Sequence, residues 1–253
     1  MIYLKSAREV EKIRASCRLA AEAVARVIEE VAAGVTTLRL DQVAESYIRK
    51  QGGVPSAKGY RGYPKSICVS VNEVVVHGIP GERILQEGDI LAVDIAVKKD
   101  GYHGDINVSL AVGQVRAEAR RLLEITRQAM ELGLQAAVPE NRLGDLGHLI
   151  QNFVELHGYS VVRDYCGHGI GRDFHEEPQV LHFGLPGTGR RLEPGMVFTV
   201  EPMVNQRGPE VRVLADNWTA VTADGQLSAQ FEHTVAVTEI GPDILSRFSD
   251  LPF

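Results

Sequence analysis

Residues 90–111 read ILAVDIAVKKDGYHGDINVSLA, and this stretch decides the fold. The segment Ile90–Val97 has the composition of a buried strand, Asp100-Gly101 is a typical two-residue hairpin turn, and the residues that follow return as the partner strand. With the turn centred on positions 100 and 101, residue i pairs with residue 201 − i, so Asp105 lies opposite Ala96. Asp94 and Asp105 are therefore predicted to be diagonal neighbours on one face of the hairpin.

Acidic residues recur where other apolar strands are expected. Glu201 lies within Met196–Val204 (MVFTVEPMV), and Glu232 lies within Phe231–Val237 (FEHTVAV). An ionised carboxylate among apolar residues is costly unless it is paired, hydrogen-bonded or bound to a metal. Two carboxylates that lie close together also repel each other unless a cation lies between them or one of them is protonated. The acids of both parts of the chain therefore predict a cation cage.

A single imidazole completes this predicted cage. His168 lies in Cys166-Gly-His-Gly-Ile-Gly171, where the glycines allow the backbone to approach closely. A carboxylate-rich site with one imidazole suits Mn, Fe, Co or Zn better than Ca, and four carboxylates can bridge two ions. Three other interpretations stay open here: Asp94 forms an ion pair with the neighbouring lysines, His77 is a buried core residue, or the glycine-rich stretch is a phosphate-binding turn.

The order of helices and strands occurs twice along the chain. A long helix from Ser6 to Gly34 and a shorter one over Leu38–Lys50 are followed by a long helix over Arg116–Ala137 and a shorter one over Leu143–His157. Strands follow each helix pair, and the predicted ones cover Ser66–Val76, Ile90–Val97, Tyr102–Val112, Ser160–Tyr165, Met196–Val204, Glu210–Leu214, Asn217–Thr222 and Gln230–Val237.

A shorter repeat supports the duplication. Leu85-Gln-Glu-Gly88 precedes the strand that carries Asp94, and Leu192-Glu-Pro-Gly195 precedes the strand that carries Glu201. In both cases the acid follows the glycine by six residues. We therefore predict a single α+β domain over residues 1–253 with an internal repeat, approximately 1–112 and 113–253.

Composition restricts the class of protein. The 253 residues are 44% hydrophobic, which excludes intrinsic disorder, and the net charge of −6 argues against a generally basic nucleic-acid binder. Three cysteines are too few and odd in number for a disulfide framework, so we expect a reducing cytoplasm. No apolar run has the roughly 18 residues needed to span a bilayer, and we expect no membrane partner.

Five motifs occur in order along nearly the whole chain. They are Val75-Val-His-Gly-Ile-Pro80, His103-Gly-Asp105, Tyr165-Cys-Gly-His-Gly-Ile-Gly-Arg172 with Phe174-His-Glu-Glu-Pro178, Phe198-Thr-Val-Glu-Pro-Met203 and Phe231-Glu-His-Thr234. Together they closely resemble the type I methionine aminopeptidases. The resemblance implies the pita-bread fold, in which two pseudo-symmetric halves form a curved antiparallel sheet covered by helices around a dinuclear metal centre.

By this resemblance the five metal ligands fall on Asp94, Asp105, His168, Glu201 and Glu232. Asp105 and Glu232 bridge two divalent ions, Asp94 chelates one ion, and His168 with Glu201 completes the other. The cofactors implied are thus two divalent metal ions per chain, drawn from Co, Mn, Fe or Zn. Ala57 stands where many bacterial relatives carry a cysteine, and Ala96 where a threonine is common, so both positions depart from the family pattern.

The resemblance also implies the residues that contact substrate. The catalytic set is His77, His175 and Glu201: Glu201 is the general base, His175 hydrogen-bonds the scissile carbonyl oxygen, and His77 hydrogen-bonds the amide nitrogen of the departing residue. The pocket for the methionine side chain is formed by Tyr60, Tyr63, Phe174 and Trp218.

The implied activity is hydrolytic removal of the N-terminal methionine from nascent proteins and peptides, with a small second residue preferred. The resemblance further implies a cytoplasmic monomer that works near the ribosome. X-Pro aminopeptidases and prolidases share the fold but usually carry an additional N-terminal domain, for which a first helix beginning at Ser6 is expected to leave no room. Type II methionine aminopeptidases carry a sizeable insertion in the second half. Non-catalytic pita-bread proteins are expected to have lost ligands, whereas all five are present here.

Overall fold

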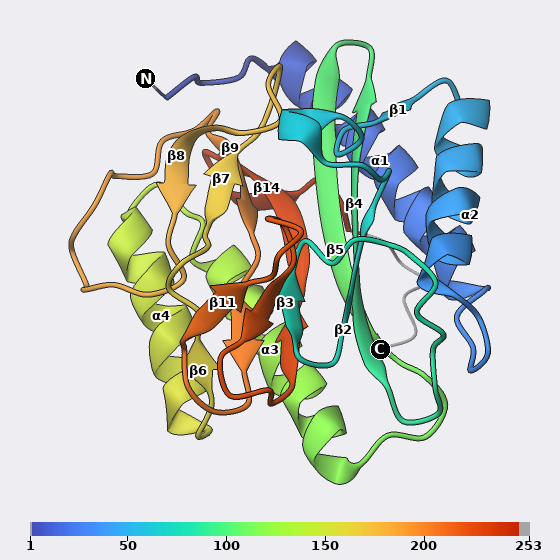
Figure 1. Ribbon diagram of the computed structural model, residues 1–253. Helices are drawn as coiled ribbons and strands as arrows, with labels where there is room; N and C mark the ends of the chain where they lie inside the picture. The colour runs from blue at the N-terminus through green and yellow to red at the C-terminus, as the bar shows by residue number, and fades with distance from the viewer. Residues whose placement is uncertain (1, 248–253) are drawn as a thin grey trace.

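The computed structural model describes residues 2–247 and has one long hairpin at its centre (Figure 1). Strands β4 (Ile90–Lys99) and β5 (Tyr102–Ala111) pair antiparallel along their whole length, and Ala96 pairs with Asp105. Asp100 and Gly101 in the turn have φ of 50° and 83°, as a two-residue hairpin turn with two positive φ values requires. The predicted register is confirmed.

The hairpin belongs to a nine-stranded antiparallel sheet with the order β1-β4-β5-β14-β9-β7-β8, in which β2 also pairs with β4 and β15 with β14. The further strands of this sheet are β1 (Val54–Pro55), β2 (Cys68–Val71), β7 (Gly167–Gly169), β8 (Glu176–Val180), β9 (Val197–Val200), β14 (Glu232–Thr238) and β15 (Gly241–Ile244). Because β14 lies between β5 and β9, a strand late in the chain joins the two halves of the sheet.

The remaining described strands form two three-stranded sheets. One has the order β13-β10-β6 and the other the order β11-β12-β3. Their strands are β3 (Val74–Val76), β6 (Ser160–Val161), β10 (Met203–Asn205), β11 (Val211–Val213), β12 (Ala220–Thr222) and β13 (Ser228–Gln230).

Several predicted strands are shorter or divided. The strand predicted over 66–76 is two strands, because Asn72 adopts a left-handed φ of 56° between them. The strand predicted over 196–204 is also divided, at Pro202, which has no N–H to donate to a ladder. The strand predicted over 230–237 begins at Glu232, since residues up to Gln230 belong to β13.

Four helices lie against the sheets: α1 (Ala7–Ile28), α2 (Thr37–Lys50), α3 (Ala117–Gln135) and α4 (Leu143–Leu156). Figure 1 shows α1 beside the β4–β5 hairpin and α2 next to α1, with α3 and α4 beside the strands of the second half. Helix α1 ends at Ile28 and not at the predicted Gly34, because Glu30 and Val31 already form tight turns onto Val27 and Ile28. No helix among residues 2–247 is long and apolar enough to cross a membrane.

The two halves repeat in detail. Gly88 and Gly195, which end the repeated tetrapeptides, both have φ of 91°. Each tetrapeptide starts with a leucine whose backbone N–H donates to a carbonyl oxygen in the loop before the second helix of its half. Leu85 donates to Val35 O at 2.8 Å, and Leu192 donates to Asn141 O at 2.9 Å. The α+β fold with two similar halves is therefore present. The predicted domain extends over 1–253, and its residues 1 and 248–253 lie outside the described part.

Helix α1 approaches β5 very closely at Gly104. A Cβ atom at this position would lie 2.3 Å from the backbone nitrogen of Cys17 and 2.7 Å from its Sγ. We expect Gly104→Ala to lower the free energy of unfolding by about 2 kcal/mol, because the added methyl group forces the helix away from the sheet. Urea denaturation followed by circular dichroism measures this change.

Gly81→Ala is the matched control. The nearest atom to a Cβ at Gly81 is Ile79 O at 3.9 Å, and we expect a change within about 0.5 kcal/mol. Equal free energies of unfolding for the two variants would contradict the close packing of α1 on β5.

Candidate active site

The acids and the imidazole of the predicted cage come from five neighbouring strands. Asp94 lies on β4, Asp105 on β5, Glu232 on β14 and His168 on β7, and Glu201 follows the last residue of β9. These strands are consecutive in the sheet, so each contributes one side chain to the same place. Along β4, β5 and β14 the acids alternate with apolar residues, and these belong to the same core cluster as the apolar residues of the helices.

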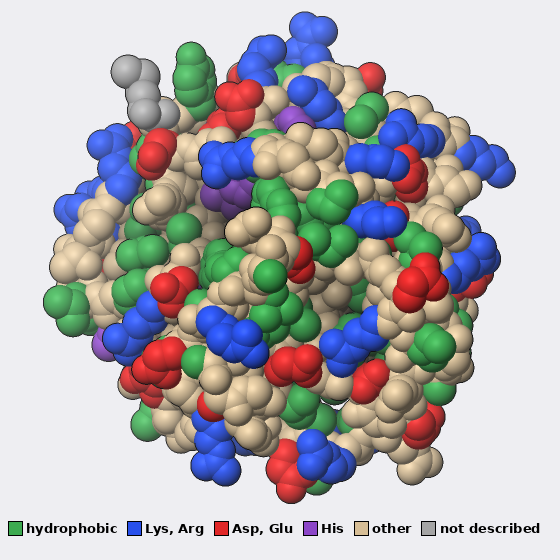
Figure 2. All heavy atoms as spheres, viewed as in Figure 1, with side chains coloured by type: hydrophobic (Ala, Val, Ile, Leu, Met, Phe, Trp, Pro, Cys, Tyr) green, Lys and Arg blue, Asp and Glu red, His purple; other side chains and the backbone are tan. Residues whose placement is uncertain are grey.

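All side chains that the sequence proposes for the site line one cavity of about 270 Å³. They are Asp94, Asp105, His168, Glu201, Glu232, His77, His175, Tyr60, Tyr63, Phe174 and Trp218, and Ala57 lines it too. On the face viewed in Figure 2, histidine side chains are visible in a hollow beside hydrophobic ones. The cavity is thus acidic where the strands converge and aromatic elsewhere.

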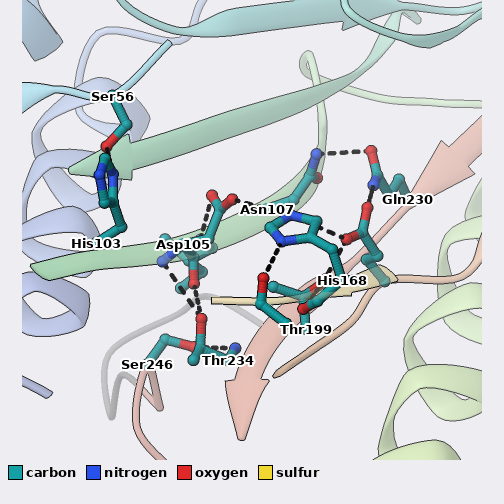
Figure 3. A network of polar contacts seen from close by, with 12 residues as sticks. Ser56, His103, Asp105, Asn107, His168, Thr199, Gln230, Thr234 and Ser246 are labelled. Carbon is teal, nitrogen blue, oxygen red and sulfur yellow. Dashed lines mark hydrogen bonds and ion pairs between the residues drawn. The ribbon is translucent and has the colours of Figure 1, made fainter. Parts of the chain in front are cut away.

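The imidazole points at the acids (Figure 3). His168 Nε2 lies 3.9 Å from Asp105 Oδ2 and 3.8 Å from Glu201 Oε1. Ligand atoms of Asp105, His168 and Glu232 all lie within 4.8 Å of one another. His168 Nδ1 is 2.9 Å from the carbonyl oxygen of Gly169, so Nδ1 carries the proton and the lone pair of Nε2 faces the carboxyl groups.

Burial and mutual repulsion disfavour the charged forms of these acids. Burial raises the pKa of Asp94 to about 7 and, together with the charge of Asp94, raises the pKa of Glu201 to about 8. The pKa values of Asp105 and Glu232 are raised well above their usual range, first by burial and then by the neighbouring acids. Burial also lowers the pKa of His168 to about 4, which leaves the ring neutral at pH 7.

The acids lack cationic partners within the protein. Among residues 2–247, no lysine or arginine forms an ion pair with Asp94, Asp105, Glu201 or Glu232, so the alternative in which Asp94 pairs with neighbouring lysines is wrong. Glu232 Oε1 is buried and has no hydrogen-bond partner among the described residues. Hard oxygen donors with one neutral imidazole suit a divalent transition-metal ion, and the residues present therefore fit such a cofactor.

Uncharged residues hold Glu201 and His168 in place. Thr199 Oγ1 donates to Glu201 Oε1 at 2.6 Å and accepts the backbone N–H of His168 at 2.9 Å. Gln230 Nε2 donates to Glu201 Oε2 at 3.1 Å, and its Oε1 accepts from Asn107 Nδ2 at 2.9 Å (Figure 3). Asn107 is paired directly with Asp94 across the β4–β5 ladder, so this chain of contacts runs from a residue beside Asp94 in the first half to Glu201 in the second.

Sequence reasoning missed these supporting residues. His182, which belongs to none of the motifs, is fully buried, and its Nε2 accepts the backbone N–H of Glu201 at 3.0 Å. No sequence signal reveals such a bond, because its partner is a backbone group. Thr199 and Gln230 each lie two residues before an acidic ligand candidate in an alternating strand pattern, and that spacing was an available signal.

Aromatic and imidazole rings form the rest of the cavity wall. Tyr60 stacks on His175 with ring centroids 5.0 Å apart, and Tyr63 meets Trp218 edge-on at 5.1 Å. His77 adopts a left-handed φ of 58°, a strained conformation that occurs most often at functional sites. Burial lowers the pKa of His77 to about 4 and that of His175 to about 3, so both rings are neutral at pH 7.

Comparison with known proteins agrees with this site. Residues 11–239 match the model of metallopeptidase family M24. The chain is 50% identical to methionine aminopeptidase 1 of Bacillus subtilis, over 98% of this chain and all of the relative. It is 47% identical to methionine aminopeptidase of Escherichia coli K12, over 98% of this chain and 95% of the relative. The chain belongs to the methionine aminopeptidases of family M24.

Solved structures place this methionine aminopeptidase family member in the same fold. The methionine aminopeptidase of Rickettsia prowazekii superposes with a TM-score of 0.96 at 43% identity, over 98% of this chain and all of that one. The prolidase of Pyrococcus furiosus superposes with a TM-score of 0.77 at 23% identity, over 97% of this chain and 66% of that one, which shows the shared pita-bread fold. The predicted fold class and family are confirmed, and the protein is a metal-dependent aminopeptidase.

The raised pKa values predict the stability of the metal-depleted protein. Asp94 and Glu201 have pKa values of about 7 and 8 in the folded chain, above their values of about 4 when unfolded, so the folded state binds more protons. This stabilising excess is lost as the pH rises through these values. We expect the melting temperature of EDTA-treated protein to fall between about pH 7.5 and pH 8.5, where the site's histidines are largely neutral in both states because their pKa is about 6.5 when unfolded.

Glu201→Gln removes one of these titrations, so its melting temperature should fall less steeply over the same range. Added Mn²⁺ or Co²⁺ should reverse the trend, because metal binding requires deprotonated ligands. A melting temperature that rises with pH in metal-depleted wild-type protein would show that the acids are not crowded as described.

Proposed function

We propose that this chain removes the N-terminal methionine from peptides and nascent proteins by metal-assisted hydrolysis, and that it prefers a small second residue. One observation carries the proposal: five adjacent strands each bring one ligand-type side chain to a single cavity whose acids have no cationic partner in the described chain. A divalent cation satisfies all of these groups at once. We also propose that residues 1–253 form a single catalytic domain.

We propose Asp94, Asp105, His168, Glu201 and Glu232 as the ligands of two divalent ions. When bound, such ions lower the pKa of a water molecule toward neutrality and polarise a carbonyl group. The unpaired Glu232 Oε1, and the burial of Asp105 close to other acids, support the place of these two residues among those that would hold such ions. The identity of the ion is left among Co, Mn, Fe and Zn, since the donor set suits each of them.

Glu201 is the proposed general base. Its carboxylate accepts hydrogen bonds from Thr199 and Gln230, which fix both oxygens, so that it can take a proton from the attacking water and pass it to the leaving amine. His175 donates a hydrogen bond to the carbonyl oxygen as negative charge develops there, and His77 contacts the departing amide nitrogen. Both rings are neutral, so each has one N–H to donate.

The aromatic wall is the proposed pocket for the methionine side chain. Tyr60, Tyr63, Phe174 and Trp218 offer the edges and faces of rings to a flexible thioether, a favourable contact for sulfur. Ala57 leaves more room at this wall than a cysteine would. We further propose that the enzyme is cytoplasmic, which its three unpaired cysteines support. By family resemblance we also propose that it is a monomer and that it meets its substrates near the ribosome.

A peptide panel tests the substrate class. We expect metal-loaded enzyme to cleave Met-Ala-Ser, to leave N-formyl-Met-Ala-Ser intact because its amino group is blocked, and to leave the X-Pro substrate Ala-Pro-Pro intact. Treatment with EDTA should abolish cleavage of Met-Ala-Ser, and Co²⁺ or Mn²⁺ should restore it. Efficient cleavage of Ala-Pro-Pro, or full activity without metal, would overturn the proposal.

His175→Ala tests the proposed contact with the carbonyl oxygen. We expect kcat for Met-Ala-Ser to fall about 100-fold, the usual loss for one hydrogen bond to a developing oxyanion, while the bound metal content is unchanged. Steady-state kinetics and metal analysis of the purified variant measure the two quantities. A variant with wild-type kcat would remove His175 from the catalytic set.

A further inference from the structure

The segment before α1 is bound to the second half of the molecule. The backbone N–H of Lys5 donates to the carbonyl oxygen of Gly195 at 2.7 Å, in the turn that leads into β9. Gly195 in turn donates its N–H to Val237 on β14 at 3.0 Å. The equivalent Gly88 of the first half has a matching bond to Val112 at 2.9 Å, yet no described segment binds its carbonyl as Lys5 binds that of Gly195.

The side chain of Lys5 is buried although it carries a charge. Only 6% of it is exposed, and its Nζ lies 2.5 Å from Glu176 Oε2, whose side chain is 14% exposed. Nζ also donates to the carbonyl oxygen of Tyr3 at 3.0 Å. Because the removal of one partner from a buried ion pair leaves an uncompensated charge, this contact strongly restrains both segments.

Glu176 is an anchor of the loop between β7 and β8. Its other oxygen, Oε1, accepts the backbone N–H of Asp173 at 3.1 Å, and its backbone pairs with Gly169 in the sheet. The ion pair also fills the space beside Gly171, where a Cβ atom would lie 2.7 Å from Glu176 Oε1 and 2.8 Å from Lys5 Cε. Lys5 therefore determines how this loop packs.

The loop carries His175, which directly precedes Glu176. The His175 ring lines the site cavity, with its centroid 4.0 Å from that of His168 and 5.0 Å from that of Tyr60. A hydrogen bond to a transition state depends on placement within a fraction of an ångström, and a misplacement of about 1 Å costs up to 100-fold in rate. A shift of Glu176 would thus be passed to His175 through one peptide unit.

We propose that Lys5 is a positioning residue for the reaction: its buried ion pair with Glu176 holds the loop 170–176 so that His175 meets the scissile carbonyl. The inference rests on the proposed function, because it takes His175 as the group that hydrogen-bonds the carbonyl oxygen. It adds the segment before the first helix to the parts of the chain on which turnover depends.

The experiment compares Lys5→Met in two backgrounds, wild type and His175→Ala, with metal-loaded enzyme and Met-Ala-Ser as substrate. In the wild-type background we expect kcat to fall about tenfold with KM within about twofold and metal affinity, measured by calorimetry, unchanged. In the His175→Ala background the same substitution should cause no further loss, because the ring through which Lys5 acts is absent. Lys5→Arg should recover most of kcat, and exposed Lys50→Met is the matched control with wild-type kinetics.

A merely structural role of Lys5 would lower kcat by the same factor in both backgrounds, and this result would overturn the inference, as would a wild-type kcat for Lys5→Met. If Lys5→Met does not fold, Glu176→Gln breaks the same ion pair while its Oε1 still accepts from Asp173, and the same expectations apply.

The His175→Ala single variant separates the two proposals. If it alone retains wild-type kcat, the role of His175 is wrong and the inference is overturned with it; if it loses kcat and Lys5→Met does not, only the inference is overturned.

Discussion

The four candidate ligand carboxyl groups share one cavity and form no ion pair with a lysine or arginine of the described chain, and the rest of the structure depends on this crowding. Such an arrangement persists only if protons or cations neutralise it, because like charges in a medium of low polarity repel strongly. The remaining features supply what the acids lack. His168 offers a neutral nitrogen, and Thr199, Gln230 and Asn107 offer hydrogen-bond donors.

The duplicated framework explains how the acids reach one place. Gly88 and Gly195 turn the chain into β4 and β9 with the same backbone angle, and six residues later each strand delivers an acid. The copies differ where the chemistry differs: Asp94 continues within a regular strand, whereas Glu201 is followed by Pro202, which ends the ladder. The equivalent glycine turns thus bring one acid from each half to the site, while the end of the ladder at Pro202 makes the surroundings of Glu201 differ from those of Asp94.

Much of the fold and of the site could be predicted from sequence where local rules determine geometry. The hairpin register followed from Asp100-Gly101, since a two-residue turn fixes which residues pair. Other parts could not be predicted. Strands β7 and β8 are short and contain glycine or proline, so they show neither the length nor the alternation of a strand. The contacts of His182 with backbone and of Lys5 with a residue far along the chain leave no local pattern.

The position of strand β14 late in the chain determines when the acidic site can be completed during synthesis. It is made after all four helices, yet it lies between β5 and β9 and contributes Glu232. A growing chain that ends before residue 232 has all four helices but neither the strand that unites the halves nor a complete set of acids. The full set of acids is therefore available only after the chain has been made past residue 232, which is later than any of the four helices.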